Sequence, residues 1–123
     1  SKATMTVMGT AGNGMQGTPG YICPDYSDHV MLGGSYMYSS ANDVFSLGVV
    51  LTEIFTGVLQ NSLKDGKNIN VYHRYIRDGV DMKSNVDKSA GNWDSLAKRN
   101  FPTLALECMS RKPEQRPSIK KIV

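Results

Sequence analysis

The segment from Ser40 to Gly57 constrains the fold of this chain more than any other part of the sequence. Apolar residues recur in it at three- and four-residue steps, the spacing of one face of an α-helix. That face consists of Val44, Leu47, Leu51, Ile54 and Val58, and the other faces carry Phe45, Val49, Val50 and Phe55. A helix that is apolar all round is stable only when it is buried on every side. We therefore predict a central buried helix over residues 40–57.

The ends of this helix carry the expected signals. Ser40, followed three residues later by Asp43, resembles a capping box, and Gly57 suits a left-handed C-terminal cap. Beyond it, the stretch 59–70 is polar and predicts a loop, while 80–92 has no clear periodicity.

Shorter helices are predicted further along the chain. One covers residues 70–78 and stops at Gly79. Another runs from Asn100 or Pro102 to Lys112, with Pro102 in its first turn and Pro113 beyond its end. Ser118 is a possible cap for a last helix.

These few helices cannot cover a central helix on every side. The chain supplies only two or three short amphipathic helices besides the apolar one. We therefore expect a mainly α fold that is a piece of a larger domain, and the lack of an initiator methionine fits that expectation.

The first 40 residues predict an extended, loop-rich segment, because glycine and proline interrupt them too often for a regular helix. Residues 12–17 match the pattern Gly-x-Gly-x-x-Gly found in nucleotide-binding loops. Such a loop should lead into a helix, or into a strand followed by a lysine. Here Pro19 and Gly20 follow, and the next lysine is Lys64. The match is therefore not interpreted as an ATP site.

Composition excludes several classes of protein. No apolar stretch is long enough to span a bilayer, and the N-terminus does not have the pattern of a signal peptide. The two cysteines and two histidines have no partners at metal-ligand spacing, so no metal site and no disulfide framework are predicted. The net charge of +3 is spread along the chain, which argues against nucleic-acid binding. An intracellular setting fits best.

Three ordered motifs are more specific. The first is Gly17-Thr18-Pro19-Gly20-Tyr21-Ile22-Cys23-Pro24-Asp25-Tyr26, and the second is Asp43-Val44-Phe45-Ser46-Leu47-Gly48-Val49-Val50-Leu51-Thr52-Glu53-Ile54. The third consists of Leu104-Ala105-Leu106-Glu107-Cys108 and Pro113-Glu114-Gln115-Arg116-Pro117-Ser118. In this order they resemble the C-terminal lobe of a protein kinase catalytic domain, and in particular the interleukin-1-receptor-associated, Pelle and plant receptor-like kinase group. The resemblance covers residues 4–123. It implies an activation segment and following loop over 1–39, the central helix over 40–57, and the remaining helices of the lobe over 58–123.

The resemblance also implies roles for individual residues. Four of them would shape the loop that receives the protein substrate: Gly17, Thr18, Tyr21 and Pro24. Asp25, where the family has glutamate, would pair with Arg116 and fix the activation segment to the lobe. Asp43 would hold the backbone of the catalytic loop. The threonines in the region where activation segments are phosphorylated are Thr4, Thr6 and Thr10.

Other interpretations of these residues stay open. Asp43 could serve only the helix cap, Asp25 and Arg116 could be unrelated surface charges, and the threonines could be ordinary loop residues.

The implied function is Ser/Thr protein kinase activity of a longer domain. Phosphoryl transfer needs a β3 lysine, a catalytic aspartate and a magnesium-binding Asp-Phe-Gly motif, and the sequence contains none of these. We therefore expect no catalytic residue in this chain, no activity of the chain alone, and ATP and magnesium bound by the rest of the kinase domain. The expected partners are that rest of the domain and a protein substrate, without nucleic-acid or membrane contact, and the expected location is cytoplasmic. The alternatives are a pseudokinase scaffold and a non-enzymatic helical interaction module.

Overall fold

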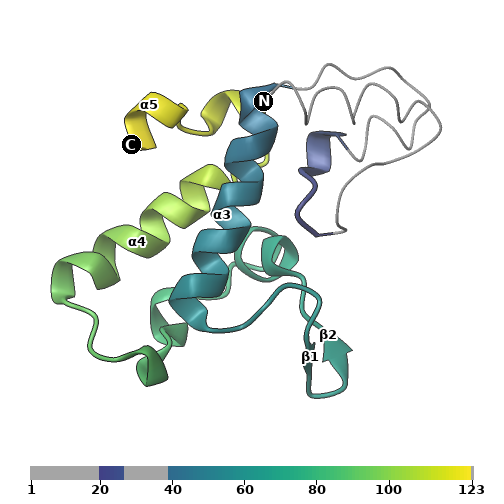
Figure 1. Ribbon diagram of the computed structural model, residues 1–123. Helices are drawn as coiled ribbons and strands as arrows, with labels where there is room; N and C mark the ends of the chain where they lie inside the picture. Colours follow the sequence, from purple (N-terminus) through teal and green to yellow (C-terminus); the bar gives the residue numbers. More distant parts are fainter. Residues whose placement is uncertain (1–19, 27–38, 123) are drawn as a thin grey trace.

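The computed structural model describes residues 20–26 and 39–122, except for the side chains at positions 64, 90, 121 and 122. These parts are mainly helical, as predicted. Helix α3 (Ser40–Thr56) forms the centre, and α4 (Ser95–Cys108) packs beside it (Figure 1). A short hairpin of β1 (Leu63–Lys64) and β2 (Lys67–Asn68) follows α3, and α5 (Ile119–Ile122) lies at the C-terminal end.

Helix α3 occupies almost the predicted range, but its N-terminal cap lies one residue earlier. The N-cap is Ser39, whose backbone N–H donates to Asn42 Oδ1 at 2.8 Å. The predicted pair of Ser40 and Asp43 is therefore wrong as a capping box. At the other end, Gly57 adopts the left-handed conformation that was predicted, and its N–H donates to the carbonyl oxygen of Glu53 at 2.8 Å.

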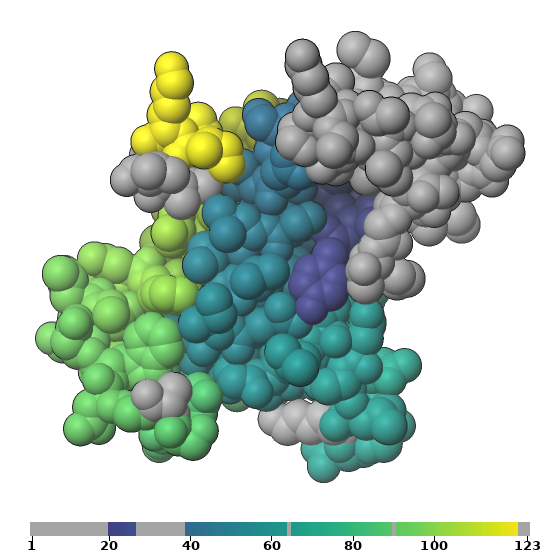
Figure 2. Space-filling view, in the orientation of Figure 1, coloured from purple at the N-terminus to yellow at the C-terminus, as the bar shows by residue number. Residues whose placement is uncertain are grey.

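Burial of α3 on every side is not observed in the described part of the chain. Phe45, Val49 and Phe55 are at most 1% exposed, but Val50 is 39% and Ile54 52% exposed. The difference arises because the described neighbours of α3, which are mainly α4 and segment 20–26, leave part of its surface uncovered. Figure 2 shows α3 reaching the surface between α4 and segment 20–26. The described neighbours are thus too few to bury the helix, as the sequence predicted.

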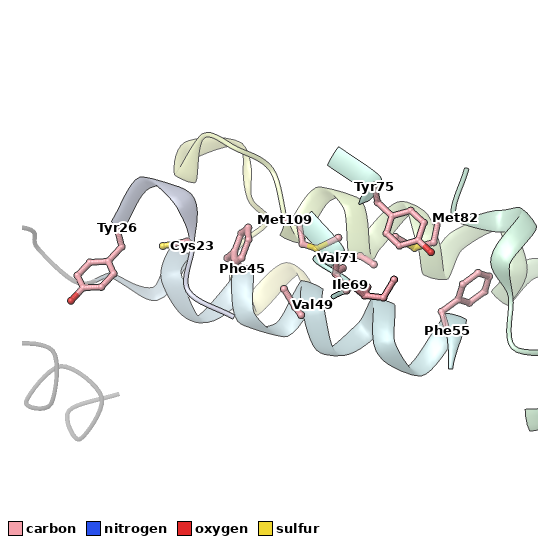
Figure 3. Packing of buried hydrophobic residues seen from close by; sticks show 11 residues of the cluster. Cys23, Tyr26, Phe45, Val49, Phe55, Ile69, Val71, Tyr75, Met82 and Met109 are labelled. Carbon is pink, nitrogen blue, oxygen red and sulfur yellow. The ribbon is translucent and has the colours of Figure 1, made fainter. Parts of the chain in front are cut away.

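Close packing of α3 on α4 depends on a residue without a side chain. A Cβ atom added at Gly48 would lie 2.7 Å from Met109 Cγ and 2.8 Å from Cys108 Cβ. Further along α3, the ring of Phe55 lies 5.2 Å from the ring of Trp93 and 5.7 Å from that of Phe101. These contacts and the cluster shown in Figure 3 form the core.

Helix α4 begins much earlier than predicted. Asp94 is its N-cap, and the Asp94 carboxylate accepts a hydrogen bond from the N–H of Ala97 at 2.8 Å. Pro102 therefore lies inside the helix, not in its first turn, and the helix ends at Cys108 rather than at residue 112. A proline inside a helix is costly, but Pro102 is fully buried, so its packing offsets part of that cost.

The segment between α3 and α4 contains elements that the sequence analysis left as loop. The turn of the β1–β2 hairpin is Asp65-Gly66, whose φ angles of 52° and 76° are both positive. Asp-Gly is a strong signal for such a turn. The helix predicted over 70–78 is present as residues 71–77, of which His73–Arg77 form a wider π-helical turn. Short 3-10 turns follow at Lys83–Asn85, Lys88–Ala90 and Pro113–Gln115.

Candidate functional site

Segment 20–26 is attached along one face of α3. The hydroxyl of Ser46 donates to the carbonyl oxygen of Tyr21 at 2.7 Å, and Asn42 Nδ2 donates to Cys23 Sγ at 2.6 Å. The phenol of Tyr21 donates to Glu53 Oε2. Residues 42, 46 and 53 are four and seven positions apart, so they lie on the same side of a helix. The polar residues of this apolar helix therefore form the surface that holds the segment.

Arg116 binds the other end of this segment. Its Nη2 donates to Asp25 Oδ1 at 2.6 Å, and the Arg116 side chain is 0% exposed, against 18% for that of Asp25. Its Nε donates to the carbonyl oxygen of Ser110 at 2.8 Å, and its Nη1 to that of Ala41 at 3.1 Å. The guanidinium group also lies 5.1 Å from the ring centre of Phe45. One side chain thus joins the helical turn at 24–26, the start of α3 and the turn after α4.

The methylene that Asp25 lacks relative to glutamate does not prevent this contact. The planar guanidinium group presents several donors in fixed directions, so it can serve the carboxylate and two carbonyl groups together. The structure brings Asp25 and Arg116 together, and they are not separate surface charges.

Glu53 is a residue that the sequence analysis did not single out. Its Oε2 atom accepts hydrogen bonds from the hydroxyl of Tyr21 and, at 2.8 Å, from the N–H of Gln60. Gln60 Oε1 in turn accepts from the N–H of Val71 at 2.7 Å. The available signal was a carboxylate inside an otherwise apolar helix, because a buried charge needs partners.

The contact with Glu53 also changes the acidity of Tyr21. The pKa of the phenol rises from 10.0 to about 12, first because its hydroxyl donates to Glu53, and then because of burial and the negative charge of Glu53. The phenol therefore stays protonated, and remains a donor, throughout the physiological pH range.

The side chain of Gln60 lies against the start of segment 20–26. A Cβ atom added at Gly20 would lie 1.9 Å from Gln60 Nε2, and φ of Gly20 is 91°. Gln60 Nε2 is buried, and no group within residues 20–26 and 39–122 forms a hydrogen bond with it. The close approach leaves room for glycine alone at position 20.

The remaining predicted site residues divide into two groups. Pro24 is half-buried and opens the helical turn at 24–26, and Asp43 is half-buried in the first turn of α3. The others lie outside the described residues: Gly17, Thr18, Thr4, Thr6 and Thr10. Their roles stay predictions.

Cys23 and Cys108 are buried and not joined to each other. Burial raises the pKa of the Cys23 thiol, and it raises that of Cys108, helped by the charge of Glu107, to about 11. Within residues 20–26 and 39–122, no three acidic, histidine or cysteine side chains are grouped to hold a metal ion. Segment 20–26, by contrast, is held near both of its ends, by Glu53 and by Arg116.

No helix in the described part of the chain has both the length and the apolar character needed to cross a membrane.

Comparison with known proteins extends over nearly the whole chain. Residues 3–123 match the family model of the protein kinase domain. A probable LRR receptor-like serine/threonine-protein kinase of Arabidopsis thaliana is 34% identical over 109 residues, which are 89% of this chain and 10% of that protein. A second such kinase is 32% identical over 89% of this chain and 12% of its own length. A putative cysteine-rich receptor-like protein kinase of the same plant is 31% identical over 87% of this chain and 17% of its own length.

Proposed function

Because this chain belongs to the protein kinase domain family, we propose that it is part of a Ser/Thr protein kinase that transfers the γ-phosphoryl group of ATP to protein hydroxyl groups. The similar plant proteins are named as receptor-like serine/threonine kinases, which supports this choice of acceptor. The chain spans only about a tenth of the length of those relatives. The catalytic activity is accordingly assigned to a longer protein.

The observation that carries this proposal is the buried contact between Arg116 and Asp25. It fixes one end of segment 20–26, while Tyr21 and Glu53 fix the part nearer position 20. A segment held at both ends can present a fixed surface to a substrate, which lowers the entropy cost of binding. We assign substrate docking to Gly17, Thr18, Tyr21 and Pro24.

The chain's second role is support of the catalytic site. Asp43, at the start of α3, is assigned to hold the catalytic loop, which lies in another part of the kinase domain. The exposed side chains of Val50 and Ile54 favour a further packing partner for α3, because apolar surface gains stability on burial. The same missing part would bind ATP and magnesium. Among the described residues, no group of three or more acidic, histidine or cysteine side chains is placed to hold a metal ion.

Regulation and location belong to the same proposal. Phosphorylation of Thr4, Thr6 or Thr10 would add charge that an arginine can bind. An intracellular setting is supported by two buried free cysteines, since thiols stay reduced there.

A phosphotransfer assay tests this proposal. The purified chain with radiolabelled ATP and a Ser/Thr peptide should show no turnover, whereas a kinase domain that contains this chain should phosphorylate the peptide. In that domain, Thr18→Ala should raise KM for the peptide, and Thr103→Ala, an exposed threonine on α4, is the control. Turnover by the isolated chain, or equal effects of the two substitutions, would contradict the proposal.

A further inference from the structure

Two hollows meet on the surface formed by the hairpin and the helical segment 71–77. The smaller, of about 260 Å³, extends from the end of α3 to residues 84–86. The larger, of about 790 Å³, lies along the hairpin and the turn that follows it. Ile69 and Arg74 line both hollows. The two hollows are therefore adjacent, with Ile69 and Arg74 between them.

The smaller hollow has the character of a side-chain pocket. Its walls are of mixed character: five lining residues are apolar or aromatic, Val58, Ile69, Val71, Tyr75 and Val86, and the others are Thr56, Arg74, Ser84 and Asn85. An apolar cavity of about 150 Å³ is enough to bind benzene, so this hollow has room for one aliphatic or aromatic side chain.

The larger hollow carries a local excess of positive charge. Its charged lining residues are Lys67, Arg74, Arg77, Asp65 and Asp78. Arg77 and Asp78 bind each other through two hydrogen bonds, of 2.8 and 3.3 Å, and so neutralise each other. The positive charges of Lys67 and Arg74 are then opposed by a single carboxylate in the lining, that of Asp65. The guanidinium group of Arg74 lies 5.7 Å from the ring centre of Tyr75, at the boundary with the apolar pocket.

We propose that the two hollows together bind an acidic peptide segment of a partner protein, with one apolar side chain next to carboxylates. The apolar side chain would fill the smaller hollow, and a carboxylate beside it would bind Arg74, with Lys67 available to a second one. Two available cations and a side-chain pocket suit a peptide better than a nucleic acid, whose affinity depends on many phosphate contacts. This docking site goes beyond the proposed kinase function, since it uses neither ATP nor segment 20–26.

Fluorescence anisotropy with the purified chain tests this site without any phosphotransfer. The probe is a fluorescein-labelled peptide, Gly-Ser-Asp-Asp-Leu-Asp-Ser-Gly. We expect saturable binding, and a rise in Kd of about tenfold or more for Lys67→Glu and for Arg74→Glu. Lys98→Glu is the matched control, because it makes the same charge change at an exposed position on α4. It should change Kd by no more than about twofold.

Two further peptides separate the pocket from the charges. Replacing leucine by alanine should raise Kd about tenfold, and replacing the aspartates by asparagine should raise it at least as much. Circular dichroism of each variant checks that it is folded. If Arg74→Glu unfolds the chain, Lys67→Glu still tests the site, because Lys67 is exposed on β2. Equal weakening by Lys98→Glu, an unchanged Kd for the alanine peptide, or no binding up to about 1 mM would overturn the proposal.

Discussion

The substitution Arg116→Ala should destabilise this chain more than most single changes can. It would leave the carboxylate of Asp25, which is only 18% exposed, without its cation. It would also remove the donors to the carbonyl groups of Ser110 and Ala41. Breaking a buried ion pair by removing one partner costs about 3–5 kcal/mol. Since single domains are stable by only about 5–15 kcal/mol, we expect a loss of that size to approach the whole stability.

Urea unfolding, followed by the fluorescence of the single tryptophan, measures this loss. Trp93 packs against Phe55 and Phe101 in the core, so its emission should report unfolding. Arg116→Lys should lose about 2 kcal/mol, because an ammonium group cannot reproduce the planar set of donors. The control is Arg77→Ala, which removes an ion pair with Asp78. The side chain of Arg77 is 60% exposed and that of Asp78 is 51% exposed. Exposed pairs contribute about 0–1 kcal/mol.

A double substitution separates the ion pair from the other contacts of Arg116. The double variant Asp25→Ala with Arg116→Ala should lose less free energy of unfolding than the sum of the two single losses. When both side chains are removed, neither charge is left buried without its partner. If Arg116→Ala cost less than about 1 kcal/mol, or no more than Arg77→Ala, the reasoning from burial would be refuted. Strict additivity of the double variant would show that the two side chains do not interact.

Three further predictions concern Gly20, Tyr21 and the two buried cysteines. Gly20→Ala should lower the free energy of unfolding in urea by at least about 2 kcal/mol, because the added methyl group meets Gln60. The control is Gly66→Ala, which should lose only about 1 kcal/mol, since Gly66 has a positive φ but no atom within 4 Å of the added Cβ. Equal losses would contradict this prediction. The pKa of Tyr21 is raised in the folded state from 10.0 to about 12, so its contribution to stability is complete below pH 10 and lost as pH rises toward 12. Tyr21→Phe should remove this part of the pH dependence, and an unchanged unfolding profile between those pH values would disprove the link. Finally, because both cysteines are buried, a thiol reagent at pH 8 should label neither of them until urea unfolds the chain. Rapid labelling of the folded chain would contradict this prediction, because it would show that the thiols are accessible.

The central helix could be predicted because its signals are local. Apolar periodicity and Gly57 gave its length, while the cap at Ser39 and Asn42 was missed because Ser40 and Asp43 offer the same residue types one position later. The family motifs likewise led to Asp25 and Arg116, which are 91 residues apart and which no local pattern could connect. Resemblance supplied that pair, whereas periodicity supplied the helix.

The misses have a common physical cause. Helix α4 contains Pro102 in its interior, where propensity alone forbids it, and only the buried environment makes that position acceptable. The N-cap is Asp94, a residue that the sequence analysis did not consider. Glu53 was passed over because the sequence does not show which groups a buried carboxylate will meet. Its partners, Tyr21 and Gln60, come from separate segments that the fold brings together.

The distance along the sequence between Asp25 and Arg116 also determines when their contact can form in a cell. Arg116 is added 91 residues after Asp25, which takes roughly 5–20 s at usual rates of synthesis. Until then α3 can form its backbone hydrogen bonds, but the turn at 24–26 has no cation to bind. A ribosome that stops before residue 116 would therefore release a chain in which segment 20–26 keeps its contacts with α3, while the turn at 24–26 lacks its ion pair with Arg116.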